Sequence, residues 1–207
     1  DVVQQHLAKV DFGGFSRLSH LKLAGFLHDI GKFSTWTIEE GKHRFIKHDD
    51  VGSKLAAKFL KGLHFSNKQI DYVSSMVKYH IYPSSVMASA QITEKIMMRY
   101  VRKMDSNAID AIILAQADRL SARGPEITEA IVERNINSLN MLLKFYLEAK
   151  DSLKPLPKLL SGNEVMEILN ITQSPKLGEI MAALHEAQMS GEVTTKEHAI
   201  NFVKNLI

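Results

Sequence analysis

The chain has 207 residues, 45% of them hydrophobic, and a net charge of +3. This length and apolar content support one large domain, or one domain with a small satellite. Cysteine is absent, which excludes disulfides and cysteine-ligated zinc and favours a reducing, cytoplasmic setting. No stretch approaches the roughly 20 consecutive apolar residues of a membrane-spanning helix, so we expect no membrane partner.

The charge is unevenly distributed along the chain. Residues 1–150 carry 21 basic and 16 acidic side chains, whereas residues 151–207 carry 5 basic and 7 acidic ones. The basic excess of the first part suits a phosphate-bearing partner. An ordinary protein surface is the simpler interpretation of that excess.

Apolar residues at spacings of three and four predict helices through most of the chain. The expected helices cover residues 1–10, 17–30, 49–63, 66–82, 93–104, 107–122 and 127–149. Ser66 and Gln69 have the spacing of a capping box at the start of one of them. Residues 33–46 lack helical periodicity, and they predict a small β-hairpin whose turn contains Gly41.

Residues 152–158 contain two prolines and are predicted to form a linker, so we place a domain boundary between residues 151 and 152. Three short helices are expected beyond it, near residues 163–170, 175–190 and 195–206. The predicted fold is therefore all-α. It consists of about seven helices with a small β-hairpin insertion over residues 1–151, followed by a short helical C-terminal subdomain over residues 152–207.

Polar side chains lie on helix faces that are otherwise lined by apolar or small residues. They are His28, Asp29, His48, His80 and Asp118. A buried carboxylate is costly unless it is paired or bound to a cation. Two carboxylates and three imidazoles on the inner faces of four helices are most economically explained by one shared partner, a divalent metal. These ligand types suit zinc, manganese, iron, nickel or cobalt.

Each of these residues also has a simpler interpretation when it is taken alone. A lone histidine on an apolar face, such as His48 or His80, is more often a satisfied core residue than a ligand. Asp118 could pair with a nearby arginine. Taken together, the five residues would each need a separate hydrogen-bond partner, and for that reason we favour the metal site.

The run Leu23-Ala-Gly-Phe-Leu-His28-Asp29-Ile-Gly31-Lys32 resembles the signature of the HD superfamily of metal-dependent phosphohydrolases. His48, His80 and Ala117-Asp118 follow in the order of that family. The resemblance implies an HD-domain helical bundle that hydrolyses a phosphoester of a nucleotide or RNA. It further implies a divalent ion (Mn, Ni, Co, Fe, Zn or Mg) held by His28, Asp29 and Asp118. Asp29 would bridge to a second ion held by His48 and His80.

The end of the chain is similar to the C-terminal segment of bacterial tRNA nucleotidyltransferases and poly(A) polymerases. The runs that carry this resemblance begin at Leu159, Ser174 and Glu186. It implies RNA, including tRNA, as a partner. No strand-rich region with the paired-aspartate metal motif of the nucleotidyl-transferring head is visible, so we do not expect the chain to transfer nucleotides. The alternative function is a non-catalytic helical domain that positions RNA for such a head in a CCA-adding enzyme or poly(A) polymerase.

The family pattern includes one more ligand histidine, upstream of the His-Asp pair. His6 is the only candidate on the first helix, and a surface histidine is the preferred interpretation of it. The run from Asp1 to Gln5 resembles the part of that helix just after the ligand. We therefore expect the chain to be a piece of a longer protein, with the ligand before Asp1.

Several residues near the predicted site are candidate phosphate or RNA contacts. Lys32, one turn beyond Asp29, would hold a phosphate as a point charge and take a catalytic role beside Asp29, or it is a solvated lysine. Arg44 and Lys47 belong to a basic stretch that could follow an RNA backbone, although a solvated surface is favoured. Trp36, the only tryptophan, could stack a base or anchor its loop in the core, and we favour the anchor.

Overall fold

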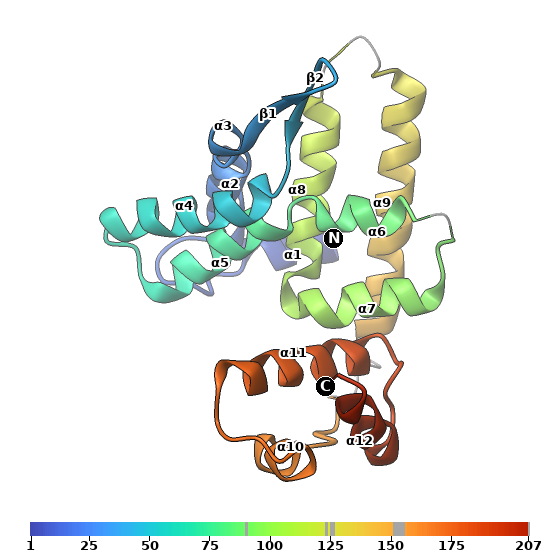
Figure 1. Ribbon diagram of the computed structural model, residues 1–207. Helices are drawn as coiled ribbons and strands as arrows, with labels where there is room; N and C mark the ends of the chain where they lie inside the picture. Colours follow the sequence, from blue (N-terminus) through green and yellow to red (C-terminus); the bar gives the residue numbers. More distant parts are fainter. Residues whose placement is uncertain (90, 123, 125–126, 151–155, 207) are drawn as a thin grey trace. The chain divides into compact units, whose positions relative to one another are not determined.

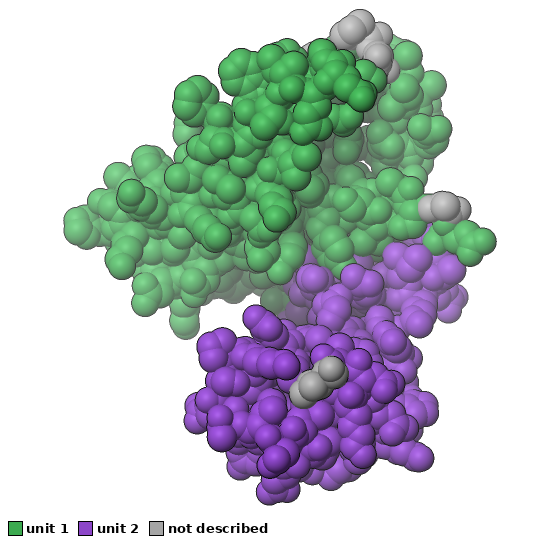
Figure 2. Space-filling view, viewed as in Figure 1, with its two compact units in different colours: residues 1–91, 106–145 green, residues 92–105, 146–207 purple. Residues whose placement is uncertain are grey.

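The computed structural model describes residues 1–89, 91–122, 124, 127–150 and 156–206. The described residues form helices and one two-stranded sheet (Figure 1). This confirms the predicted all-α class with a small β insertion. The chain divides into two compact units, one of residues 1–91 and 106–145 and the other of residues 92–105 and 146–207 (Figure 2). Within the described ranges, no helix is long and apolar enough to cross a membrane.

The first unit, called unit 1, contains most of the predicted helices at the expected positions. Its elements are α1 (Val2–Ala8), α2 (Arg17–Leu27), α3 (Lys32–Thr35), β1 (Trp36–Glu39), β2 (Lys42–Phe45), α4 (His48–Gly62), α5 (Asn67–Tyr79), α6 (Tyr82–Met87), α8 (Ala108–Ser121) and most of α9 (Glu129–Ala149). The short helices α3 and α6 were not predicted. The helix expected over residues 66–82 stops before Pro83, and Pro83 lies in the first turn of α6, where a missing N–H costs nothing.

The core of unit 1 forms where α5 packs against α4 and α2. Ala56 and Leu60 of α4 and Val73 and Val77 of α5 are fully buried. The predicted capping box is present at the start of α5. The Ser66 side chain accepts a hydrogen bond from the Gln69 backbone N–H, and the Gln69 side chain accepts one from the Ser66 N–H. Helix α8 packs against both α2 and α5, which completes the helical frame around the predicted ligands.

Strands β1 and β2 form the predicted hairpin between α3 and α4. Trp36 pairs with Phe45 at its base, and the two-residue turn is Glu40-Gly41. Both turn residues have positive φ angles, of 50° and 74°. Such a turn has the twist that joins two antiparallel strands without splaying them, and glycine adopts it without strain.

A buried polar network joins α1, α2, α5 and α8. The carboxylate of Asp110 is fully buried and accepts hydrogen bonds from Arg17 Nη2 at 2.8 Å, Tyr72 Oη at 2.6 Å and His6 Nε2 at 2.7 Å. The prediction that His6 is a surface histidine was therefore wrong. A buried carboxylate needs several donors, and His6 supplies one of them, a long-range requirement that the local sequence does not reveal.

The second unit, called unit 2, contains α7 (Glu94–Met104), α10 (Gly162–Leu169), α11 (Pro175–Met189) and α12 (Lys196–Lys204). The three helices of the tail pack around Val165, Leu184 and Val203. Helix α7 joins this unit through Glu186, which pairs with Arg99 at 3.0 Å. The domain boundary expected between residues 151 and 152 lies outside the described residues and stays a prediction.

The Asp110 network predicts how stability depends on pH. Burial alone would raise the pKa of Asp110, but hydrogen bonds from His6, Arg17 and Tyr72 together lower it below 3.8. A carboxylate with a lowered folded-state pKa stabilises the fold above its unfolded-state pKa, and this contribution is lost as the pH falls through the folded-state value. Asp110→Asn should therefore cost about 3 kcal/mol of unfolding free energy at pH 7. It should also flatten the loss of stability below about pH 4.

Urea denaturation at several pH values measures both effects. Asp71→Asn, which alters an exposed carboxylate on α5, is the control and should change the unfolding free energy by less than about 0.5 kcal/mol. An Asp110→Asn protein that loses stability in acid as steeply as the wild type would contradict the assignment.

Candidate metal centre

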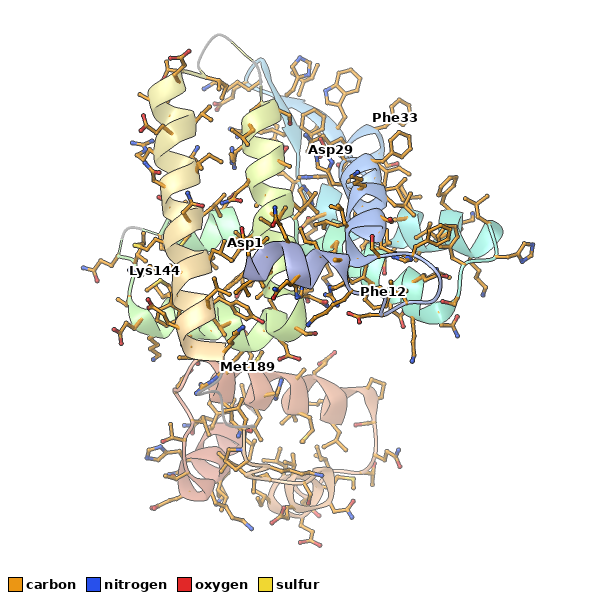
Figure 3. The ribbon with its side chains drawn as sticks, turned by 180° about the vertical axis from the view of Figure 1, so that it is seen from behind. Asp1, Phe12, Asp29, Phe33, Lys144 and Met189 are labelled. Atoms are coloured by element: carbon orange, nitrogen blue, oxygen red, sulfur yellow. The ribbon has the colours of Figure 1, made fainter. Side chains whose placement is uncertain are left out.

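The five polar side chains predicted as ligands meet in unit 1, where several helices begin or end. His28 is the C-cap of α2 and His80 that of α5, while His48 is the first residue of α4. Asp29 follows His28 at the end of α2 (Figure 3), and Asp118 lies in the last turn of α8. The carbonyl ends of α2 and α5 carry partial negative charge, so both helices favour a cation here.

The carboxylate of Asp29 lies at the centre of this group. Its Oδ2 is 3.2 Å from His28 Nε2 and 2.6 Å from Lys32 Nζ. Its Oδ1 faces the other two histidines, at 3.7 Å from His48 Nε2 and 3.9 Å from His80 Nε2. The two oxygens of one carboxylate thus face two different sets of nitrogen atoms.

The remaining predicted ligand, Asp118, joins the group through His28. Its Oδ1 lies 3.5 Å from His28 Nε2. Asp29, His48 and His80 each offer one ligand atom within 4.8 Å of the others, which is close enough to hold a metal ion. His28 and Asp118 therefore stand beside a three-residue candidate site, on the Oδ2 side of Asp29.

All three histidines are oriented by the same backbone contact. The Nδ1 atoms of His28, His48 and His80 lie 2.7, 2.8 and 2.6 Å from the carbonyl oxygens of the residues three positions earlier. A ring that donates from Nδ1 in its neutral form presents a lone pair at Nε2. Carbonyl partners of this kind commonly fix the tautomer of metal-bound histidines.

The Nε2 atoms of His48 and His80 face each other, and in their neutral forms neither carries a proton to donate. His48 Nε2 lies 3.2 Å from His80 Nε2, so two lone pairs point at each other unless a proton or a cation lies between them. In the described part of unit 1, Asp29 Oδ1 is a buried polar atom without a hydrogen bond. Such atoms are rare, and the Nε2 atoms of His48 and His80 both face this one, so the donor set fits a divalent metal ion.

Electrostatics give the cluster two carboxylates and one strongly basic imidazole. Hydrogen bonds to Asp118 and then Asp29 raise the pKa of His28 to about 10. The bond to His28 lowers the pKa of Asp118. Burial alone would raise the pKa of Asp29, but His28 and Lys32 together lower it. Burial lowers the pKa of His80. At neutral pH, therefore, a proton on His28 balances the carboxylates, and a metal ion would replace it.

A close approach of two backbones holds Asp29 beside His48. A Cβ atom on Gly31 would collide with the carbonyl oxygen of His48 and come within 2.6 Å of the Gly52 nitrogen. In the sequence, Gly31 was noted only as part of the run that resembles the HD signature. The contact joins residues that are 21 positions apart, so local periodicity could not reveal it.

Of the other residues that the sequence offered for this site, Lys32 contacts Asp29. Among the described residues, side-chain contacts to the five ligands are not seen for Arg44, Lys47 or His6. Arg44 is exposed and lies opposite Thr37, one position from Phe45, so strand alternation directs it to the other face of the hairpin. Lys47 is exposed and precedes α4 with a φ of 62°. His6 hydrogen-bonds Asp110. Asp110 lies eight residues, or about 12 Å, before Asp118 on α8, so His6 lies away from the candidate ligands.

The structure also corrects the interpretation of Trp36 as a core anchor. Its side chain is 51% exposed. The indole donates from Nε1 to His43 Nδ1 at 2.7 Å, and the two rings stack with centroids 5.6 Å apart. The anchor prediction failed because a two-stranded hairpin offers a tryptophan no second layer in which to be buried.

Comparison with known proteins supports both resemblances found in the sequence. The HD domain family model matches residues 6–123. A CC-adding tRNA nucleotidyltransferase of Thermus thermophilus is 34% identical over 184 residues, which are 88% of this chain and 39% of that protein. An A-adding tRNA nucleotidyltransferase of Deinococcus radiodurans is 32% identical over 186 residues, which are 89% of this chain and 41% of that protein. The chain thus spans about two fifths of the length of these relatives.

The contact at Gly31 predicts a strong effect from a single methyl group. Gly31→Ala should lower the free energy of unfolding by about 1–3 kcal/mol, because backbone atoms of α4 must move to admit the Cβ. Gly178→Ala in α11 is the matched control, since its Cβ would meet nothing within 4 Å. The control should be neutral or stabilising by up to about 1 kcal/mol. Thermal and urea denaturation of the two variants measure the difference, and equal stabilities would refute the role given to Gly31.

Proposed function

Because the chain belongs to the HD-domain family, we propose that unit 1 is a metal-dependent phosphohydrolase that acts on nucleotides or RNA ends. The observation that carries the proposal is the convergence of three Nε2 atoms on the Asp29 carboxylate. A structural ion network would not leave lone pairs facing one another, whereas here the Nε2 atoms of His48 and His80 lie 3.2 Å apart and both face Asp29 Oδ1, which has no hydrogen bond. The names of the two relatives favour an RNA substrate, and tRNA in particular.

The geometry suggests which residues would hold the metal. Asp29 Oδ1, His48 and His80 would hold one ion, because their ligand atoms already lie close together. His28 and Asp118, with Asp29 Oδ2, would hold a second ion once the proton on His28 is released. When bound, a divalent ion makes hydroxide available from water near neutral pH and neutralises charge on phosphoryl oxygens.

Lys32 has a role in this proposal that depends on the state of the site. Its ammonium group pairs with Asp29 Oδ2 at 2.6 Å, and its side chain is 40% exposed. A cation bound to the same carboxylate would repel the ammonium group and free it to turn outward. Lys32 would then bind a phosphoryl oxygen of the substrate as a point charge and help to orient it.

A second function is supported by the relatives rather than by the cluster. Both relatives are named as tRNA nucleotidyltransferases, and the chain covers only part of each. Unit 1 would in that case position RNA without catalysing hydrolysis, and the basic excess of residues 1–150 would bind its backbone. RNA positioning alone would not need Nε2 atoms that converge on Asp29. We therefore favour hydrolysis over this second function.

Removal of the central carboxylate tests the phosphohydrolase proposal. The wild type should bind Mn²⁺, Ni²⁺, Co²⁺ or Zn²⁺ and hydrolyse 2′,3′-cyclic or monophosphate ends of nucleotides. Asp29→Ala should weaken metal binding and lower hydrolysis at least about 100-fold, because both groups of histidines lose their shared ligand. Asp50→Ala, which removes an exposed partner of Lys78, is the control and should leave both unchanged. Elemental analysis and phosphate release measure the outcome. Equal hydrolysis by wild type and Asp29→Ala would refute the proposal.

Binding of tRNA under increasing salt tests the second function. An RNA-positioning domain should bind tRNA with an affinity that falls steeply as salt rises, because the contacts are to phosphates. Asp29→Ala should bind as well as the wild type. Electrophoretic mobility shift or fluorescence anisotropy measures the affinity, and absence of binding at low salt would count against this function.

A further inference from the structure

One face of the β1–β2 hairpin is lined by rings and apolar groups. Trp36 lies opposite Phe45, and Ile38 lies opposite His43. Side chains alternate along a strand, and directly paired residues share a face, so these four side chains lie on the same side of the hairpin. The Trp36 and His43 rings stack across the strands with an interplanar angle of 22°. This ring-lined face is called the aromatic face below.

The aromatic face is continuous with the candidate metal centre. Lys32 Nζ lies 5.6 Å from the centroid of the Phe45 ring and 2.6 Å from Asp29 Oδ2. The backbone carbonyl of Phe45 also accepts the hydrogen bond from His48 Nδ1, at 2.8 Å. Phe45 therefore contacts both a candidate phosphate-binding residue and a candidate ligand.

Much of this surface is exposed although it is apolar. Trp36 is 51% and Ile38 is 61% exposed, and Phe33 of the adjoining α3 is 90% exposed. Phe33 and Asp29 lie at the same end of α2 (Figure 3). Large aromatic side chains that face water together commonly mark a binding surface. The hydrogen bond from Trp36 Nε1 to His43 Nδ1 holds the indole in a fixed orientation, which reduces the cost of ordering it on binding.

The charge around the aromatic face favours a nucleotide over an apolar protein partner. The cation beside this face is Lys32, next to the Phe45 ring, whereas Lys42 and Arg44 pair with Glu39 and Thr37 on the opposite face of the hairpin. Aromatic rings that stack bases, beside cations that bind phosphates, form the usual surface for single-stranded nucleic acid. An apolar protein surface would gain nothing from the charge of Lys32.

We propose that the aromatic face is a base-stacking platform, on which Trp36 holds a nucleobase of the substrate while the neighbouring phosphate lies at Lys32. The proposal rests on the proposed function for the identity of the phosphate site. It adds that the substrate is recognised through its base as well as its phosphate, so that a nucleotide or single-stranded RNA end is preferred over a phosphoester without a base.

The fluorescence of Trp36, the only tryptophan in the chain, reports binding without hydrolysis. In the full chain with EDTA present, adenosine 3′-monophosphate should quench the fluorescence saturably, whereas ribose 5-phosphate should not. Absence of quenching by the nucleotide would overturn the proposal whether or not the protein hydrolyses phosphoesters. Quenching in a protein that hydrolyses nothing would support the platform and refute the phosphohydrolase.

Steady-state kinetics of the metal-loaded chain separate binding from catalysis. Trp36→Ala should raise KM for adenosine 3′-monophosphate about tenfold with kcat little changed, and leave KM for ribose 5-phosphate unaltered. Trp36→Phe should retain most of the affinity because a ring remains. Phe15→Ala, which removes an aromatic side chain that is 60% exposed in another part of unit 1, is the control and should change neither KM.

Two results of these experiments would contradict the platform. One is a Trp36→Ala protein with unchanged KM for both substrates. The other is a wild type that sediments as a dimer and a Trp36→Ala protein that sediments as a monomer, because the aromatic face would then be a contact between two copies of the chain. Circular dichroism and metal binding of each variant confirm that unit 1 remains folded.

Discussion

The candidate site depends on the carboxylate of Asp29, which contacts both groups of histidines. Its Oδ2 faces His28 and Lys32, and its Oδ1 faces His48 and His80. A half-buried carboxylate is stable as an anion only with positive partners, and here they are His28 at the end of α2 and Lys32 of α3. The close contact of Gly31 with the α4 backbone sets this arrangement, because it fixes the start of α3 against the residues that present His48.

Helix α8 carries two acidic residues, Asp110 and Asp118, and the hydrogen bonds around them differ. Asp110 is fully buried, and its two oxygens accept hydrogen bonds from Arg17, Tyr72 and His6. About 12 Å along the helix, Asp118 pairs with His28 at the edge of a cluster in which Asp29 Oδ1 is buried without a hydrogen bond. The same chain therefore satisfies a buried carboxylate completely where it serves the fold. The unpaired Oδ1 of Asp29 and the facing Nε2 atoms of His48 and His80 indicate a partner that lies outside the polypeptide.

The sequence predicted those parts of the fold and the site that depend on periodicity and short-range chemistry. His80 was expected on an apolar helix face, and it is 2% exposed. The hairpin and the Ser66 capping box were likewise predicted from local signals. The burial of His6 and the contact at Gly31 were not, because each depends on residues that are distant in the sequence. Trp36 was expected to anchor its loop in the core, but the hairpin has no second layer to cover it, and the side chain is 51% exposed.

The position of the hairpin in the chain links recognition to the metal centre. It lies between Asp29 and His48, and α3 is all that separates β1 from the HD motif. Phe45 ends β2 and orients His48 through its carbonyl, while its ring lies beside Lys32. A base held on the aromatic face would fix the position of Phe45. Phe45 contacts His48 through its backbone carbonyl and Lys32 through its ring, so both residues would be held in place. The insertion thus offers the site a way to favour phosphates that carry a nucleobase, with the ligand geometry itself unchanged.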